Sequence, residues 1–108
     1  MVLFASAGIR TNNQGGFACD FRVKSNNGQT GWSGEKSLGG WAEWSYDDLI
    51  GAGFKDGDSC WVAVKIQSGQ ENHESGNNFK LSNNGIHCSY DVTGTTVNPS
   101  WNGPNGYP

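Results

Sequence analysis

Five tryptophans in a chain of 108 residues are the side chains with the clearest capacity for chemistry. They are Trp32, Trp41, Trp44, Trp61 and Trp101, and they stand among Gly, Asn, Ser and Thr rather than among Leu and Ile. Only 34% of the chain is hydrophobic, so burying all five rings is difficult, and an exposed indole usually has a binding partner. We expect at least two of the rings to be exposed.

Amide and carboxylate side chains indicate what such a surface could bind. An indole stacks on the apolar C–H face of a pyranose ring, while the sugar hydroxyls need amide, carboxylate and backbone partners. Asp56, Asp58, Asn77 and Asn78 offer such partners in polar stretches. With the five tryptophans they form the predicted ligand-binding set, and the predicted function is that of a lectin-like protein with a glycan ligand. Modules of this kind often gain affinity by multivalency, so a homodimer is a further expectation.

A second hypothesis uses the same aromatic rings differently. Trp and Tyr suit interfaces because one end of each ring is apolar and the other is polar. A defence or toxin-like protein that meets a membrane or a partner protein through its tryptophans is therefore the alternative function.

The charge of the chain argues against other partners. The formal net charge is −3, charged residues make up 16%, and no five-residue window holds more than two basic residues. Binding to a phosphate backbone needs a stripe of Lys and Arg, so we expect no nucleic-acid partner. No stretch approaches 18 apolar residues, which predicts no transmembrane segment.

The start of the chain predicts no signal peptide. The stretch from Met1 to Ala7 is too short for the apolar region of a secretory leader and lacks a basic start. No Asn forms a glycosylation sequon, because Pro99 spoils the one at Asn98. We expect a cytoplasmic protein or leaderless secretion, with the mature form of a secreted protein as the alternative.

An enzyme would need an acid, a base or a nucleophile in a recognisable arrangement. His73 and His87 are the two histidines, and neither stands at a metal-ligand spacing or beside a nucleophile elbow. The string from Asp56 to Ser59 resembles part of a calcium loop but lacks the run of ligands and the closing Glu. We therefore expect a non-enzymatic protein with no catalytic residue, no metal and no cofactor.

One local string resembles a known family. His73-Glu74-Ser75-Gly76-Asn77-Asn78-Phe79 resembles the late His and Ser-Gly-Asn-Asn-Phe segment of small microbial guanyl-specific ribonucleases, and it implies a small acidic ribonuclease as the third hypothesis. In that family a His, a Glu and an Arg precede the late His, with the Arg after the Glu. Here no His precedes His73, and Arg10 and Arg22 come before every Glu. The general acid/base pair of the family therefore does not map onto this chain.

The three cysteines open three similar stretches, which predict the core. Cys19–Val23, Cys60–Val64 and Cys88–Val92 each alternate Cys, an apolar residue and Val. Period-two alternation places these three on one face of a strand, so we expect three core-facing strands with buried thiols. One disulfide with one free thiol is the alternative.

Turn and cap residues complete the predicted architecture. Asn26-Asn27-Gly28 ends the strand 18–25 in a hairpin, and Ser45 caps a helix that Gly51 stops. We expect an all-β fold, an antiparallel β-sandwich or small barrel of about six to eight short strands with one short helix near residues 46–50. Residues 1–97 form a single domain, and 98–108 form an irregular Pro/Gly/Asn-rich tail that packs on it, with the polar run 67–78 as an exposed loop.

Strand phase divides the tryptophans. On the strand 60–67, Trp61, Ala63 and Lys65 face away from the core, although a loop or the tail could cover Trp61. Trp41 and Trp44 lie three residues apart, which on a strand places them on opposite faces.

Overall fold

The computed structural model describes residues 4–66, 72–75, 77–83, 85–95 and 98–107, which form nine strands and one helix. The elements are β1 (Phe4–Asn13), β2 (Cys19–Ser25), β3 (Gly28–Gln29), β4 (Trp41–Ser45), α1 (Tyr46–Gly51), β5 (Ser59–Ile66), β6 (Asn72–Glu74), β7 (Phe79–Leu81), β8 (Ile86–Thr95) and β9 (Asn98–Tyr107). The predicted all-β sandwich with one short helix is confirmed. The strand count exceeds six to eight because the sheet includes three very short strands, β3, β6 and β7.

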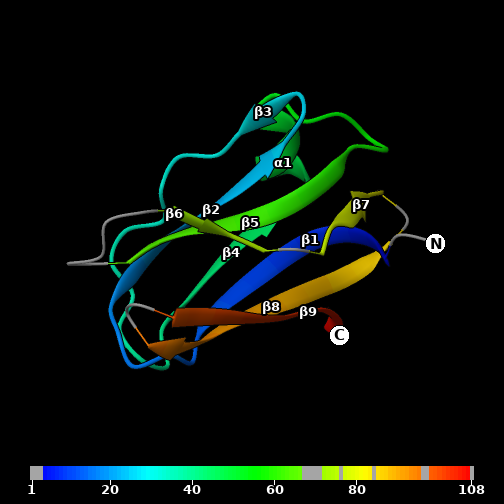
Figure 1. Ribbon diagram of the computed structural model, residues 1–108. Helices are drawn as coiled ribbons and strands as arrows, with labels where there is room; N and C mark the ends of the chain where they lie inside the picture. The colour runs from blue at the N-terminus through cyan, green and yellow to red at the C-terminus, as the bar shows by residue number, and fades with distance from the viewer. Residues whose placement is uncertain (1–3, 67–71, 76, 84, 96–97, 108) are drawn as a thin grey trace.

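The strands form two layers that are joined at one end (Figure 1). One layer runs β4-β1-β8-β9, and the other runs β3-β2-β5-β6. The short strand β7 connects them, because it pairs antiparallel with β5 and parallel with β1. The first layer is thus not purely antiparallel, since β1 also pairs parallel with β8. This arrangement leaves two broad outer faces, one on each layer.

The core lies between the layers and follows the alternation in the sequence. Phe21, Phe79 and Tyr90 are its largest fully buried rings. Cys19, Cys60 and Cys88 are fully buried and none of them is in a disulfide, which confirms the prediction of core-facing thiols. Burial, followed by nearby acidic groups, raises the pKa of the Cys19 and Cys60 thiols to about 12.

Helix α1 begins where the sequence predicts. The Ser45 hydroxyl accepts a hydrogen bond from the Asp48 backbone N–H, and the Asp48 carboxylate accepts one from the Ser45 N–H, so the two residues form a capping box. Leu49 is the buried residue of the helix, and its burial fixes the helix against the core.

Two polar stretches contain more regular structure than their composition predicts. Residues 98–107, expected to be irregular, form the edge strand β9, where Pro99 and Pro104 need not donate to a further neighbour. Trp101 packs edge-on against Tyr90 and so anchors the strand to the core. Residues 72–74, expected to be loop, pair with β5 as β6, whereas 67–71 lie outside the described residues.

Candidate functional site

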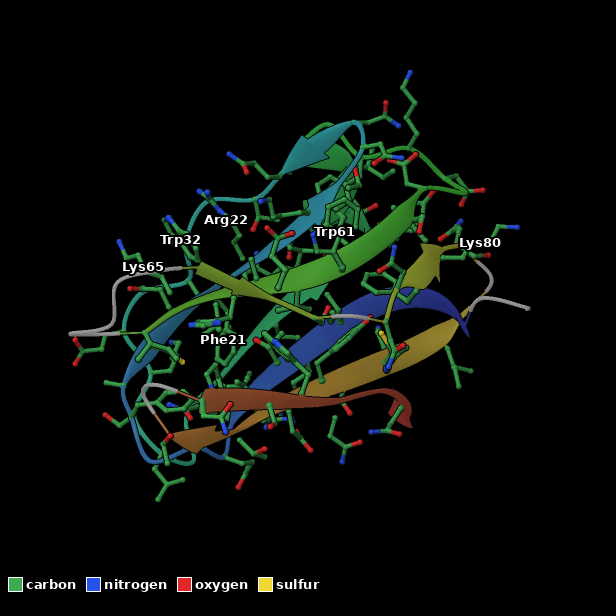
Figure 2. The ribbon with its side chains drawn as sticks, viewed as in Figure 1. Phe21, Arg22, Trp32, Trp61, Lys65 and Lys80 are labelled. Carbon is green, nitrogen blue, oxygen red and sulfur yellow. The ribbon has the colours of Figure 1, made fainter. Side chains whose placement is uncertain are left out.

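The outer face of the β2–β5 layer carries Trp61 and Trp32, and both rings have partners within the chain. Trp61 faces outward as predicted, but its indole N–H donates to the Glu74 carboxylate on β6. Trp32 lies against Arg22, whose guanidinium carbon is 4.2 Å from the ring centroid, and Lys65 is 5.5 Å from the same centroid. Figure 2 shows Arg22, Trp32 and Lys65 gathered together, with Phe21 between the layers. Both rings are half-buried in contacts that the fold itself supplies.

Trp44 and Trp101 belong to the inner side of the other layer. Both are partly buried and pack against the hydrophobic core. The ring of Trp101 meets Tyr90 at 88°, with 6.2 Å between centroids. These two tryptophans therefore stabilise the sandwich by packing against its core.

Trp41 differs from the other four tryptophans. It is 46% exposed, which makes it the one tryptophan among the large exposed hydrophobic residues of the described chain. On β4 it faces outward, while Trp44 faces the core, so the predicted division of the pair is confirmed. The expectation of at least two exposed rings is wrong for the described residues, where Trp41 alone is exposed and Trp32 and Trp61 are half-buried.

Arg10 stacks on the Trp41 ring. Its guanidinium carbon lies 4.0 Å from the ring centroid, and the two residues are diagonal neighbours on β1 and β4, since Arg10 pairs with Glu43 and Trp41 pairs with Asn12. A cation over one face fixes the orientation of the indole. The residue remains 46% exposed, so part of it is accessible to a ligand although Arg10 lies over the ring. A ring that is held in advance loses less conformational entropy on binding.

Polar side chains extend the surface from Trp41 across the outer face of its layer. The strand register places Asn12 beside Trp41 and Asp91 beside Asn12. The Asn12 side-chain amide donates to the Asp91 carboxylate at 2.8 Å. Both side chains are half-buried, and their sequence neighbours Thr11, Asn13, Tyr90 and Val92 face the core. An ordered amide–carboxylate pair therefore lies next to the open indole.

An open groove of about 490 Å³ adjoins the same ring, along the edge of β4 that does not pair with β1. Ser33, Lys36, Trp41, Ala42, Glu43 and Trp44 line it. The volume lies within the range of small-molecule sites, which is about 300–1,000 Å³. The groove thus adds an ammonium, a carboxylate and a hydroxyl to the surroundings of Trp41.

The far wall of the groove is a segment that follows β2 without being a regular strand. Thr30, Ser33 and Lys36, spaced three apart, each bond to β2 through their backbone N–H groups, at Val23, Phe21 and Cys19 respectively. The hydroxyls of Thr30 and Ser33 in turn accept from the N–H groups of Val23 and Phe21. Two residues separate successive contacts with β2. Trp32, which is one of them, lies on the outer face of the β2–β5 layer against Arg22, and the contact residue Lys36 lines the groove.

Asn13 is a residue that the sequence analysis missed. Its side chain is fully buried, and its amide donates to the carbonyl oxygens of Phe17 at 2.6 Å and Lys36 at 2.9 Å. Its carbonyl accepts from the N–H of Gly15 at 2.9 Å, and its backbone bonds to Gly39 and Gly40. Asn13 therefore ties the groove wall to the start of β4. The Asn-Asn pair in the sequence resembles a turn, and no local pattern marks one Asn as buried.

The predicted ligand partners Asp56 and Asp58 lie in the turn before β5 and hold that turn together. Asp56 accepts hydrogen bonds from the Tyr46 hydroxyl and the Asn83 N–H, both at 3.1 Å. Asp58 accepts from Ser25 and Asn27 side chains and from the Lys55 N–H. Burial, with the Asp56 hydrogen bond, raises the pKa of Tyr46. The structure does not bring either carboxylate to Trp41.

Asn77 and Asn78 lie between β6 and β7 and also bond within the chain. The Asn77 amide donates to the Gly103 carbonyl at 3.3 Å, and its backbone carbonyl accepts from the Tyr90 hydroxyl at 2.8 Å. The Asn78 amide donates to the Ser59 hydroxyl at 2.8 Å. These contacts join β9, the core and β5, and they place neither residue beside an exposed tryptophan.

No group of three His, Cys, Asp or Glu side chains is placed to hold a metal ion in the part of the chain that the structure describes. His73 lies half-buried on β6, opposite Val64. His87 is exposed on β8, with its ring over Gly8, where a Cβ atom would come within 2.5 Å of it.

Comparison with known proteins identifies the fold alone. No protein family matches the chain, and no curated protein matches it either. A solved structure called "Trapped Toxin" is similar, with a TM-score of 0.52 and 15% identity. The match covers 89% of this chain and 23% of that one, so this chain spans about a quarter of the length of its structural neighbour. Within the described residues, no helix has the length and apolar character needed to span a bilayer.

Proposed function

We propose that this chain is a non-enzymatic binding protein that takes a neutral carbohydrate at Trp41. The 46% exposure of Trp41, with Arg10 stacked on its ring, is the observation that carries the proposal. A pyranose would stack its C–H face on the indole. Its hydroxyls would bond to Asn12 and Asp91 on the sheet and to Glu43 or Lys36 in the groove.

The other predicted stacking residues have smaller roles in this proposal. Trp61 and Trp32 already use the indole N–H or a ring face for contacts within the chain. The same is true of the predicted polar partners Asp56, Asp58, Asn77 and Asn78, whose hydrogen bonds join turns and strands. The ligand surface is therefore narrower than the predicted set and is centred on one ring.

A glycan array followed by titration of tryptophan fluorescence tests the proposal. Trp41→Ala removes the stacking ring and should weaken the affinity at least about thirtyfold, which corresponds to roughly 2 kcal/mol at a central aromatic contact. Trp32→Ala is the matched control, because that ring is also stacked on an arginine but lies on the opposite outer face. Equal losses in both variants, or no sugar-dependent change in the parent protein, would contradict the assignment.

The second candidate is a component of a toxin, and the observation that favours it is the fold shared with a part of the chain called "Trapped Toxin". In that case Trp41 would meet a membrane or a protein instead of a sugar. Flotation with vesicles of phosphatidylcholine and phosphatidylserine separates the two candidates. Binding to vesicles that depends on Trp41 and is unaffected by free oligosaccharide would favour the toxin component.

A further inference from the structure

The outer face of the β4-β1-β8-β9 layer carries one row of side chains that crosses all four strands. Trp41 pairs with Asn12, Asn12 pairs with Asp91, and Asp91 pairs with Asn102. Paired residues project from the same face of a sheet, and each of these four alternates with inward-facing neighbours such as Ala42, Thr11, Tyr90 and Trp101. The row therefore continues from the open indole across to the edge strand.

The polar side chains of this row can form hydrogen bonds with ligand hydroxyl groups along its length. The Asn12–Asp91 hydrogen bond uses one amide N–H and one carboxylate oxygen. By their ordinary capacity, the second amide N–H, the amide carbonyl and the other carboxylate oxygen can still bond to a ligand. Asn102 is exposed and adds a donor and an acceptor at the far end.

The charges on this face and in the adjoining groove balance one another. Glu43 and Asp91 are acidic, while Arg10 and the groove residue Lys36 are basic, so these four side chains have no net formal charge. Arg10 already stacks on Trp41. A surface with balanced charges offers no net attraction to a uronate, a sulfated chain or a phosphate backbone, whereas a neutral sugar needs no opposite charge.

The length of the row sets the size of the ligand. Neighbouring strands are about 4.8 Å apart, so the three steps from β4 to β9 span about 14 Å. A single pyranose stacked on Trp41 cannot reach Asn102 over that distance. We infer that the ligand is an extended neutral oligosaccharide lying across the strands, with one sugar on Trp41 and later sugars on Asn12, Asp91 and Asn102. This inference rests on the proposed carbohydrate function.

A length series tests the inference. The probes are β-1,4-linked oligomers of glucose, mannose and N-acetylglucosamine, from one to six units, titrated by calorimetry. In the series that binds, the affinity should rise at least about tenfold between one and four units and then level off, because the added sugars gain hydrogen bonds of about 1 kcal/mol each.

Two variants on β9 test the direction of the chain. Asn102→Ala should lower the affinity for the four-unit oligomer about three- to tenfold and leave the single sugar unchanged. Asn98→Ala is the matched control, since Asn98 is an exposed Asn on the same strand, paired with Thr95, about 13 Å along the strand from Asn102. It should change neither affinity. Unchanged urea midpoints show that both variants fold.

Two outcomes would overturn the inference without touching the proposed function, and a third would overturn the proposed function itself. A single sugar that binds as tightly as four, with Trp41→Ala still abolishing binding, leaves the function intact and removes the extended ligand. A loss on Asn98→Ala instead of Asn102→Ala means that the later sugars do not follow the row from Trp41 to Asn102. If no oligomer of any length binds the parent protein, the carbohydrate function itself is wrong.

Discussion

Substitutions at Asn13 test whether its side-chain hydrogen bonds hold the groove wall in place. Its side chain makes three hydrogen bonds, to the carbonyls of Phe17 and Lys36 and to the N–H of Gly15. Asn13→Ala removes all three, and at about 1 kcal/mol each the free energy of unfolding should fall by about 3 kcal/mol. Because a domain of this size is stable by about 5–15 kcal/mol, the variant should still fold.

Urea unfolding followed by fluorescence measures this loss. With a denaturant slope of about 2 kcal/mol/M, a loss of about 3 kcal/mol shifts the midpoint down by about 1.5 M. Asn13→Asp is nearly isosteric and keeps the acceptor for Gly15, but it places a carboxylate against two carbonyl oxygens. It should therefore be less stable than Asn13→Ala at pH 7, and the gap should narrow near pH 4, where a protonated Asp can donate one hydrogen bond.

Two results would refute the reasoning about Asn13. A loss below about 1 kcal/mol for Asn13→Ala would mean that water or neighbouring groups replace the amide without cost. An Asn13→Asp variant that is more stable than Asn13→Ala at pH 7 would mean that the side chain does not face the two carbonyls. Either result would leave the position of Lys36 and the start of β4 without the support described above.

Three further predictions concern the frame that positions the site. The pKa values of the Cys19 and Cys60 thiols are raised in the folded state from an ordinary 9.0 to about 12, so their contribution to stability is fully present below pH 9 and is lost as pH rises towards 12. Urea titrations should show that the free energy of unfolding falls by about 2–3 kcal/mol between pH 8 and pH 10, and that in Cys60→Ala it falls by about half as much. An equal fall in that variant and in the parent protein would contradict this. Cys19, Cys60 and Cys88 are buried free thiols, so Ellman's reagent should react with none of them in the native protein and with all three in urea, and rapid native reaction would be inconsistent with this core. Ser45→Ala removes half of the capping box and should lower the free energy of unfolding by about 1 kcal/mol, whereas Ser45→Asp, which keeps a capping acceptor, should lower it less; equal losses would exclude the cap.

Residues with a local signal were predicted well. Period-two alternation placed Cys19, Cys60 and Cys88 in the core and turned Trp61 outward. Ser45 marked the helix start because capping depends on residues within one turn. In each case the residues that determine burial or capping are close together in the sequence, so the sequence alone predicts the outcome.

The candidate site depends on pairs that are distant in the sequence, and these could not be predicted. Arg10 meets Trp41 through the β1–β4 register, and Asn12 meets Asp91 although 79 residues separate them. Likewise, composition alone could not show that Asp58 is used by a turn, since the same carboxylate could serve a ligand or the backbone. These pairs depend on the register between strands, which tertiary packing sets and which the sequence pattern does not give.

The most direct test of the central claim is the two-dimensional ¹H–¹⁵N spectrum of the five indole N–H groups during titration with an oligosaccharide selected on the array. Trp41→Phe assigns the Trp41 signal, and Trp32→Phe and Trp61→Phe assign two others. We expect the Trp41 signal to shift with saturating ligand while the signals of Trp32 and Trp61 stay in place. Shifts at Trp32 or Trp61 with an unmoved Trp41 signal would contradict it, because the ligand would then bind the opposite layer.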